Sequence, residues 1–217
     1  MEKKAVVIFS GGPDSTTLLY LTIKRGYRAY PITFDYGQIA KKEIESAEKI
    51  AGSLGLDLKK VDLSVLKDIY IGSTSLVDEK IPITREFSKQ LVVPFRNGLM
   101  LSFAVAYAQS IGAKYIFYGA QGSDEPYYPD CRSSFVRVFQ RAARLGTDTK
   151  ILIKAPLIKM KKSEVIKLGR ELGVPFEMTW SCYKGGERHC GVCESCINRK
   201  KAFLEAGVPD PTNYEIV

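Results

Sequence analysis

The chain has 217 residues, of which 45% are hydrophobic and 26% charged, and its formal net charge is +8. This ordinary globular composition suits one domain with a small appendage, and no run approaches the roughly 18 apolar residues of a membrane span. Its start, Met-Glu-Lys-Lys, leads into an apolar strand rather than a signal peptide, so we expect a cytoplasmic protein without a membrane partner.

Apolar strands alternate with amphipathic helices along most of the chain. We expect strands at residues 4–9, 28–34, 58–63, 115–119 and 151–155. We expect helices at 14–25, 39–53, 97–112, 132–145 and 161–172, and a last helix through 199–204. Residues 64–95 are less regular and suggest a long excursion over the sheet edge. This order predicts an α/β fold: a doubly wound, mainly parallel five-stranded sheet with helices on both faces.

The stretch from Val6 to Leu19 carries the clearest functional signal. An apolar strand ends in Ser10-Gly11-Gly12-Pro13, and a helix then opens with Asp14-Ser15-Thr16. Two glycines allow a sharp turn, and a helix N-terminus attracts anions, so the stretch is a candidate phosphate-binding loop. It is not a Walker loop, which needs a lysine here, nor a dinucleotide fingerprint, which needs a third glycine. A plain strand-to-helix turn is the alternative.

Four of the five cysteines gather near the C-terminus with the spacing C-x7-C-x2-C-x2-C: Cys182, Cys190, Cys193 and Cys196. In a cytosolic chain such clustering points to a metal site rather than to disulfides. An iron–sulfur cluster is the rival, but lysines stand where a ferredoxin-like motif continues with cysteine and proline. We therefore predict structural zinc, held by a segment of residues 179–217 that packs on an α/β domain of residues 1–178.

Several polar motifs fall where the predicted strands end, which is where such sheets bind ligands. They are the Ser10–Ser15 loop, Phe34–Gln38, Gly119–Asp124 and Pro156. The pairing of arginine with a polar or acidic residue in Arg96-Asn97 and in Asp130-Cys131-Arg132 suits a planar heterocycle or its carboxylate. Each pair also reads as a helix cap with a surface arginine.

The basic residues are spread along the chain rather than gathered on one helix. They include Lys41-Lys42, Lys59-Lys60, Lys159 to Lys162 and Arg199 to Lys201. A lysine of the Lys159–Lys162 group could steady phosphates, although a solvated basic turn explains any one of them. We favour a solvated surface overall and expect no direct nucleic-acid partner.

Together, these motifs closely resemble those of the 7-cyano-7-deazaguanine synthases, within the N-type ATP pyrophosphatase (PP-loop) superfamily. The resemblance runs in order through nearly the whole chain. It rests on FSGGPDSTTLL at Phe9–Leu19, DYGQ at Asp35–Gln38, VPFRN at Val93–Asn97, YPDCR at Tyr128–Arg132, PLIKMKKSE at Pro156–Glu164, and W-S-C-Y then H-C-G-V-C-E-S-C within Trp180–Cys196. The chain departs from the family pattern at Phe95 and at Asp124–Tyr128.

The resemblance implies an ATP-dependent ligase that makes 7-cyano-7-deazaguanine from 7-carboxy-7-deazaguanine and ammonia, for queuosine and archaeosine. The steps would be adenylation of the carboxylate, amide formation and dehydration to the nitrile. ATP would be a co-substrate, with Mg²⁺, structural Zn²⁺, free ammonium and a homodimeric chain. The enzyme alternative is another PP-loop adenylating enzyme, acting on tRNA or a protein carboxylate. The non-enzyme alternative is a zinc-stabilised nucleotide-binding module.

The resemblance also implies which residues bind each ligand. ATP would contact Phe9, Ser10, Gly11, Gly12, Pro13, Asp14, Ser15, Thr16, Thr17, Leu18, Leu19 and Phe34. Among these, Ser10, Asp14 and Ser15 would act catalytically with Lys162, and Asp14 would reach the magnesium ion. The deazaguanine would contact Arg96, Asn97, Asp130 and Arg132.

Overall fold

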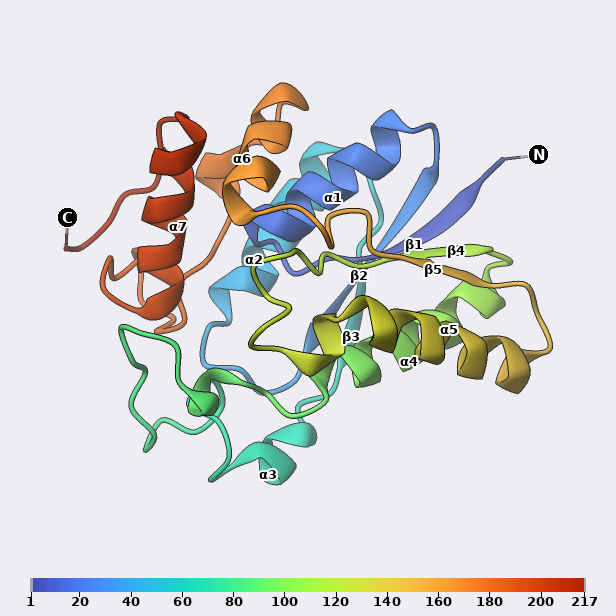
Figure 1. Cartoon of the computed structure of the whole chain (residues 1–217), viewed down its shortest axis with the longest axis horizontal. Coiled ribbons are helices and arrows are strands. Elements are labelled where there is room, and N and C mark those ends of the chain that lie inside the picture. Colours follow the sequence, from blue (N-terminus) through green and yellow to red (C-terminus); the bar gives the residue numbers. More distant parts are fainter. Residues whose placement is uncertain (1, 217) are drawn as a thin grey trace.

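The computed structural model describes residues 2–216. Its centre is a five-stranded sheet in the order β3-β2-β1-β4-β5, and every neighbouring pair of strands is parallel (Figure 1). The strands are β1 (Lys4–Ile8), β2 (Arg28–Asp35), β3 (Lys59–Asp62), β4 (Tyr115–Phe117) and β5 (Leu152–Lys154). The strand order reverses beside β1, the central strand. The predicted fold class is confirmed.

Helices cover both faces of this sheet. One face carries α1 (Pro13–Lys24) and α2 (Lys42–Ser53), with α6 (Lys162–Glu171) packed on α1. The other face carries α4 (Arg96–Ser110) and α5 (Ser133–Thr147) (Figure 1). The remaining elements are α3 (Leu66–Tyr70), α7 (Glu194–Ala206) and the short 3-10 turns η1 (Lys89–Leu91), η2 (Pro129–Cys131) and η3 (Phe176–Met178).

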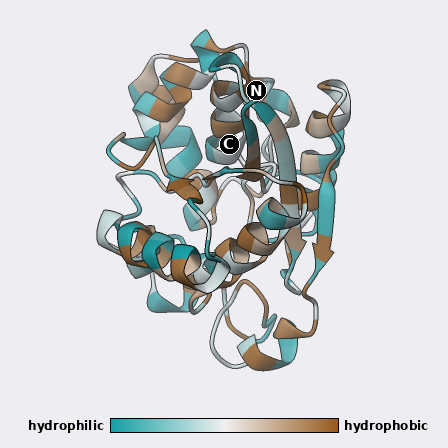
Figure 2. Ribbon diagram, turned by 90° about the vertical axis from the view of Figure 1, so that its right-hand side faces the viewer, coloured by the Kyte–Doolittle hydropathy of each residue, from teal (hydrophilic) through white to brown (hydrophobic). Residues whose placement is uncertain are grey.

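The central strand β1 is buried on both sides, which explains its continuous apolar run. Val6 belongs to the core under α4, whereas Ala5 and Val7 belong to the core under α1 and α2. Figure 2 shows the corresponding pattern in the helices, where hydrophobic residues alternate with hydrophilic ones along each ribbon. The two cores hold the strand ends in register, so the loops that follow them meet at one edge.

Residues Lys89–Ser110 are long and apolar enough, by length and composition alone, to cross a membrane. The regular α-helix within that stretch is α4, which has 15 residues and lies against β1 and β4. Its inner residues Leu101, Ala104 and Ala108 are fully buried. We therefore interpret α4 as a core helix of the α/β fold.

The predicted elements differ from the observed ones mainly at their ends. The last helix was expected only through 199–204, but α7 begins at Glu194, directly after Cys193 at its N-cap. The start of α7 is difficult to predict from sequence, because its first turn lies between Cys193 and Cys196, where the cysteine spacing dominates the pattern. The chain after residue 178 packs on α6 through α7, around Ile166 and Phe203. A domain division at 178/179 stays a prediction.

Gly169 allows α6 to approach its neighbours closely. A Cβ there would lie 2.5 Å from Phe176 Cζ and 2.6 Å from Thr17 Oγ1. We expect Gly169→Ala to lower the free energy of unfolding by about 1–3 kcal/mol through overpacking. Gly146 in α5 is the matched control, because a Cβ there meets nothing within 4 Å. Its change to alanine should raise stability by about 1 kcal/mol. If urea denaturation showed a change in the free energy of unfolding of the same sign for both variants, the prediction would be contradicted.

Candidate active site

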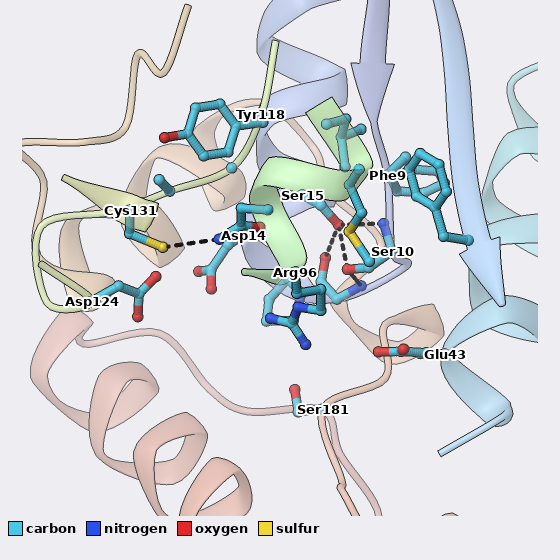
Figure 3. A pocket seen from close by; sticks show the side chains of 18 of the residues that line it. Phe9, Ser10, Asp14, Ser15, Glu43, Arg96, Tyr118, Asp124, Cys131 and Ser181 are labelled. Atoms are coloured by element: carbon cyan, nitrogen blue, oxygen red, sulfur yellow. Dashed lines mark hydrogen bonds between the residues drawn. The ribbon is translucent and has the colours of Figure 1, made fainter. Parts of the chain in front are cut away.

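A cavity of about 250 Å³ opens at the carboxyl edge of the sheet (Figure 3). Its walls come from the loop after β1, the end of β2, the starts of α2 and α4, the loop after β4, and the chain before the cysteine segment. These parts are distant in sequence and meet only because parallel strands end at the same edge. This is the edge at which the sequence placed the polar motifs.

The loop between β1 and α1 is held by its own side chains. Ser15 Oγ accepts a hydrogen bond from Ser10 N at 3.2 Å and lies 3.1 Å from Ser10 Oγ. Ser15 Oγ and Thr16 Oγ1 both donate to the carbonyl of Gly12, at 3.2 and 2.7 Å. Pro13 occupies the first turn of α1, where the missing N–H costs nothing. The loop is thus pre-formed at a helix N-terminus, the arrangement that binds anions.

Gly11 lies behind this loop in a place that only glycine fits. Its φ is +80°, and a Cβ would lie 2.4 Å from the carbonyl oxygen of Glu43 and 2.5 Å from Ala47 N, both in α2. Its own carbonyl accepts a hydrogen bond from Trp180 N at 3.0 Å. The loop therefore packs directly on α2 and on the chain that leads into the cysteines.

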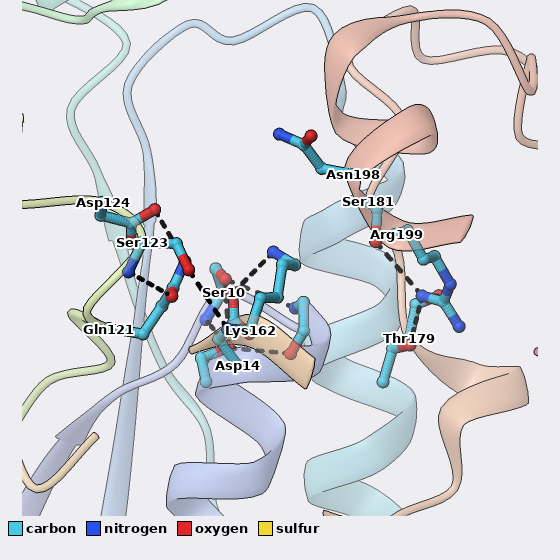
Figure 4. Close-up of polar contacts among 12 residues, drawn as sticks. Ser10, Asp14, Gln121, Ser123, Asp124, Lys162, Thr179, Ser181, Asn198 and Arg199 are labelled. Atoms are coloured by element: carbon cyan, nitrogen blue, oxygen red, sulfur yellow. Dashed lines mark hydrogen bonds and ion pairs between the residues drawn. The ribbon is translucent and has the colours of Figure 1, made fainter. Parts of the chain in front are cut away.

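One end of the cavity holds a lysine between two carboxyl groups (Figure 4). Lys162 Nζ lies 2.9 Å from Asp14 Oδ2, while Asp14 Oδ1 is buried and has no partner within residues 2–216. Burial raises the pKa of Asp124 to about 6, against the opposing charge of Lys162. Burial alone would lower the pKa of Lys162, but Asp14 and Asp124 raise it above its ordinary value, so Lys162 is charged.

The other end of the cavity holds a second carboxyl group, Glu43, at the start of α2. Gln38 Nε2 donates to Glu43 Oε1 at 2.9 Å and to the Phe34 carbonyl at 3.1 Å. Arg96 Nη1 donates to the hydroxyl of Tyr36 at 3.1 Å. Burial raises the pKa of Glu43 to about 7, although Arg96 and Gln38 act in the opposite direction. Glu43 is therefore poised to exchange a proton near neutral pH.

The structure brings most of the predicted ligand-binding residues to this cavity. Those that line it are Phe9, Ser10, Gly12, Pro13, Asp14, Ser15, Phe34, Arg96, Asn97 and Lys162. Thr16, Thr17, Leu18 and Leu19 are buried in α1 rather than on the cavity wall. The ligand contacts of all these residues stay predictions.

Asp130 and Arg132, predicted to contact the heterocycle, do not line the cavity. Both carboxylate oxygens of Asp130 accept hydrogen bonds from Asn97, from its backbone N at 3.0 Å and from Nδ2 at 3.1 Å. Arg132 is exposed, and its Nε donates to the carbonyl of Glu125 at 3.3 Å. In this structure, Asp130 fixes the orientation of Asn97, and Arg132 braces the loop before η2.

Sequence reasoning missed several residues of the cavity wall, among them Glu43, Tyr118, Trp180, Ser181 and Tyr183. Glu43 stands among other acidic residues of α2, so its pattern alone does not distinguish it. Its one available signal was the short distance in sequence from the DYGQ motif.

Cys131 also lines the cavity and lies 3.3 Å from Asn97 Nδ2. Burial raises the pKa of its thiol. The thiol is therefore held protonated, which is unfavourable for a nucleophile.

The four clustered cysteines are all buried, and their sulfur atoms lie within 4.8 Å of one another. In a tetrahedral zinc site with Zn–S bonds of about 2.3 Å, the sulfurs are about 3.8 Å apart, so the donor set fits such an ion. His189 is not needed as a ligand, because its Nε2 accepts a hydrogen bond from Ser181 N at 3.0 Å. The cluster can hold a metal ion.

Arg199 of α7 ties the cysteine segment to the cavity wall (Figure 4). It is fully buried, and its guanidinium donates to Thr179 Oγ1 at 2.8 Å and to Ser181 Oγ at 3.2 Å. Asp210 Oδ1, 3.2 Å away, balances its charge. Ser181 lines the cavity, so α7 helps to place one of its walls.

A strand–loop–helix carrying S-G-G-x-D-S, set beside the point where the strand order reverses, defines a PP-loop fold of the ATP pyrophosphatase class. The NMN synthetase of Francisella tularensis has a similar fold: its TM-score is 0.55 at 17% identity, over 96% of this chain and 78% of that chain. The family model "Queuosine biosynthesis protein QueC" matches residues 4–207, and the chain belongs to that family.

Curated relatives match the chain over nearly its whole length. The 7-cyano-7-deazaguanine synthase of Caldicellulosiruptor bescii is 44% identical over 216 residues, covering 98% of each chain. The protein of the same name from Methanoregula boonei is 46% identical over 215 residues, covering 98% of this chain and 99% of that one. The resemblance inferred from the motifs is thus confirmed.

The partly buried carboxyl of Glu43 predicts a pH dependence of stability. Its pKa rises from 4.5 to about 7 on folding. The folded state therefore binds the proton more tightly, and the stabilisation is complete below pH 4.5 and lost as the pH rises through 7. Glu43→Gln should remove this part of the fall in stability, measured as free energy of unfolding in urea across that range. Glu45→Gln, an exposed change on the same helix, should leave the fall intact. Parallel curves for wild type and Glu43→Gln would disprove the assignment.

Proposed function

We propose that this chain is an ATP-dependent carbon–nitrogen ligase that converts 7-carboxy-7-deazaguanine and ammonia to 7-cyano-7-deazaguanine, a precursor of queuosine and archaeosine. The observation that carries the proposal is the pre-formed Ser10–Ser15 loop, which opens into a cavity walled by the other family motifs. The near full-length match to synthases of that name supports the substrate.

The chemistry explains why such an enzyme needs a phosphate-binding loop. A carboxylate oxygen is a poor leaving group, so ammonia cannot displace it. Attack of the carboxylate on the α-phosphate of ATP expels pyrophosphate and makes AMP the leaving group. Ammonia then forms the C–N bond of an amide as AMP departs. A second activation of the amide oxygen allows its loss, and two N–H protons leave to give the nitrile.

Within this scheme the protein aligns the reactants and stabilises the charge that develops, and it forms no covalent bond to the substrate. We propose that Ser10, Gly12 and Ser15 hold the pyrophosphate end of ATP at the N-terminus of α1. Lys162 stands beside this loop with its charge maintained by Asp14 and would neutralise a phosphate. Phe34, at the end of β2 on the cavity wall, would contact adenine.

A magnesium ion fits the phosphate end of the cavity. Asp14 Oδ1 is buried and has no partner within residues 2–216, and carboxylate oxygen is a ligand that Mg²⁺ prefers. Such an ion would offset the charge of the departing pyrophosphate. Asp14 would hold it with one oxygen while the other stays on Lys162.

We propose that the heterocycle contacts Arg96 and Asn97, which begin α4 and line the cavity. Asp130 would act through Asn97, whose position it holds with two hydrogen bonds. Arg132 would reach the heterocycle only after leaving the Glu125 carbonyl. We propose free ammonium as the nitrogen source. We also propose that the chain forms a homodimer in the cytoplasm and has no direct nucleic-acid partner.

The test is mass spectrometry of the products formed by the purified chain from ATP, ammonium and 7-carboxy-7-deazaguanine. We expect 7-cyano-7-deazaguanine, AMP and pyrophosphate. Lys162→Met should reduce kcat/KM for ATP on the order of 10–100-fold, because a charge-assisted phosphate contact is lost. Lys159→Met, an exposed change nearby, should have little effect. Failure to form the nitrile, or ATP consumption that ignores the carboxylate, would refute the proposed function.

We propose zinc as the ion of the cysteine cluster, because four thiolates close a tetrahedral site without an open position. Metal analysis of the purified chain should find one zinc ion per chain, and Cys193→Ser should lose it and lower the thermal midpoint. Cys131→Ser, outside the cluster, should keep the ion. Iron with visible absorption would instead favour the iron–sulfur alternative.

A further inference from the structure

Glu43 occupies a place in the cavity that the steps above leave without a role. It belongs to α2, which packs on the phosphate-binding loop through Gly11. Its side chain comes from the wall opposite Asp124, with Arg96 between them in the view of Figure 3. The two carboxyl groups therefore serve different ends of one cavity.

The surroundings of Glu43 leave one carboxylate oxygen available. Oε1 accepts a hydrogen bond from Gln38 Nε2 at 2.9 Å, whereas Oε2 makes no hydrogen bond within residues 2–216. The charged groups that face it are Arg96 from α4, Asp35 from the end of β2 and Lys41 before α2. Asp35 and Lys41 form an ion pair with each other, and Arg96 is bonded to Tyr36. None of these groups forms a hydrogen bond with Oε2 within residues 2–216.

The reaction proposed above needs a group of this kind. Ammonium is a cation at neutral pH, and its nitrogen has no free electron pair until it gives up a proton. We infer that Glu43 binds the ammonium ion at its end of the cavity and accepts its proton. This inference rests on the proposed function and adds to it the binding site and proton acceptor of the nitrogen substrate.

The step balances in protons and charge. Ammonium transfers one proton to Glu43, and the resulting ammonia attacks the carbonyl carbon of the acyl adenylate. The C–N bond forms, the bond from carbon to the AMP oxygen breaks, and AMP leaves with its electron pair. A second N–H proton departs to solvent or to the phosphate, which leaves the neutral amide. Glu43 then returns its proton to solvent.

The electrostatics favour the transfer in this direction. Burial raises the pKa of Glu43 to about 7, which places it near the value that suits a general base at neutral pH. The positive charge of Arg96 acts on both groups, because it lowers the pKa of Glu43 and disfavours a second cation beside it. Asp124 is less suited, because Lys162 and Asp14 lie at its end of the cavity, beside the phosphate-binding loop.

The test separates adenylation from ammonia attack. Adenylation alone is followed as exchange of labelled pyrophosphate into ATP, which requires the carboxylate but no ammonium. Glu43→Gln should keep this exchange within about threefold and reduce product formation from ammonium by about 100-fold. Hydroxylamine is largely uncharged at neutral pH, so its nitrogen can attack without first losing a proton. Glu43→Gln should therefore form the hydroxamate at near the wild-type rate with the same nucleophile.

The pH profile and matched variants complete the test. The wild-type rate with ammonium should rise through the pKa of Glu43, near 7, and this limb should vanish in Glu43→Gln. Glu43→Asp keeps a carboxylate and should retain part of the rate, and Glu45→Gln should match wild type.

Three results would overturn the inference. If Glu43→Gln lost both pyrophosphate exchange and product formation, Glu43 would serve adenylation or folding. If Glu43→Gln lost rate equally with ammonium and with hydroxylamine, Glu43 would not be the acceptor of the ammonium proton. Absence of exchange in the wild-type chain would overturn the proposed function itself, and this inference with it.

Discussion

The close packing of Gly11 is the constraint on which the site depends. Its backbone lies against α2 without room for a Cβ, and its carbonyl accepts the N–H of Trp180. One residue thus joins three parts of the chain: the phosphate-binding loop, the helix that carries Glu43, and the segment that enters the cysteine cluster. A side chain at this position would push α2, and Glu43 with it, away from the loop.

Within the cavity, each carboxyl group is influenced by the charge of a nearby cation, and Asp14 forms an ion pair with Lys162. Lys162 lies between Asp14 and Asp124 at one end, and Arg96 lies near Glu43 at the other. Burial penalises each charge alone, and the partner of opposite sign offsets the penalty. These charges are in place before any substrate binds, so a reaction in the cavity would require little reorganisation of the protein.

The parts of the site that could be predicted from sequence are those whose functional residues lie close together along the chain. The Ser10–Ser15 loop and the cysteine spacing are local patterns, and the strands follow from apolar runs, so fold class and family came from motifs alone. Glu43 reaches the cavity only through the contact of α2 with Gly11, which no periodicity reveals. Asp130 shows a different limit, because its hydrogen bonds to Asn97 depend on the fold and cannot be read from a carboxylate at a helix start.

The cysteine cluster and the cavity are coupled through Arg199 rather than through a shared ligand. The guanidinium of Arg199 bonds the chain from Phe176 to Ser181 and pairs with Asp210 beyond α7. Removing one partner of a buried pair costs about 3–5 kcal/mol, because the other charge is left without compensation. The cluster fixes the start of α7, α7 fixes Arg199, and Arg199 fixes the wall that holds Ser181. The cysteine cluster can therefore influence the shape of the cavity although none of its four cysteines lines it.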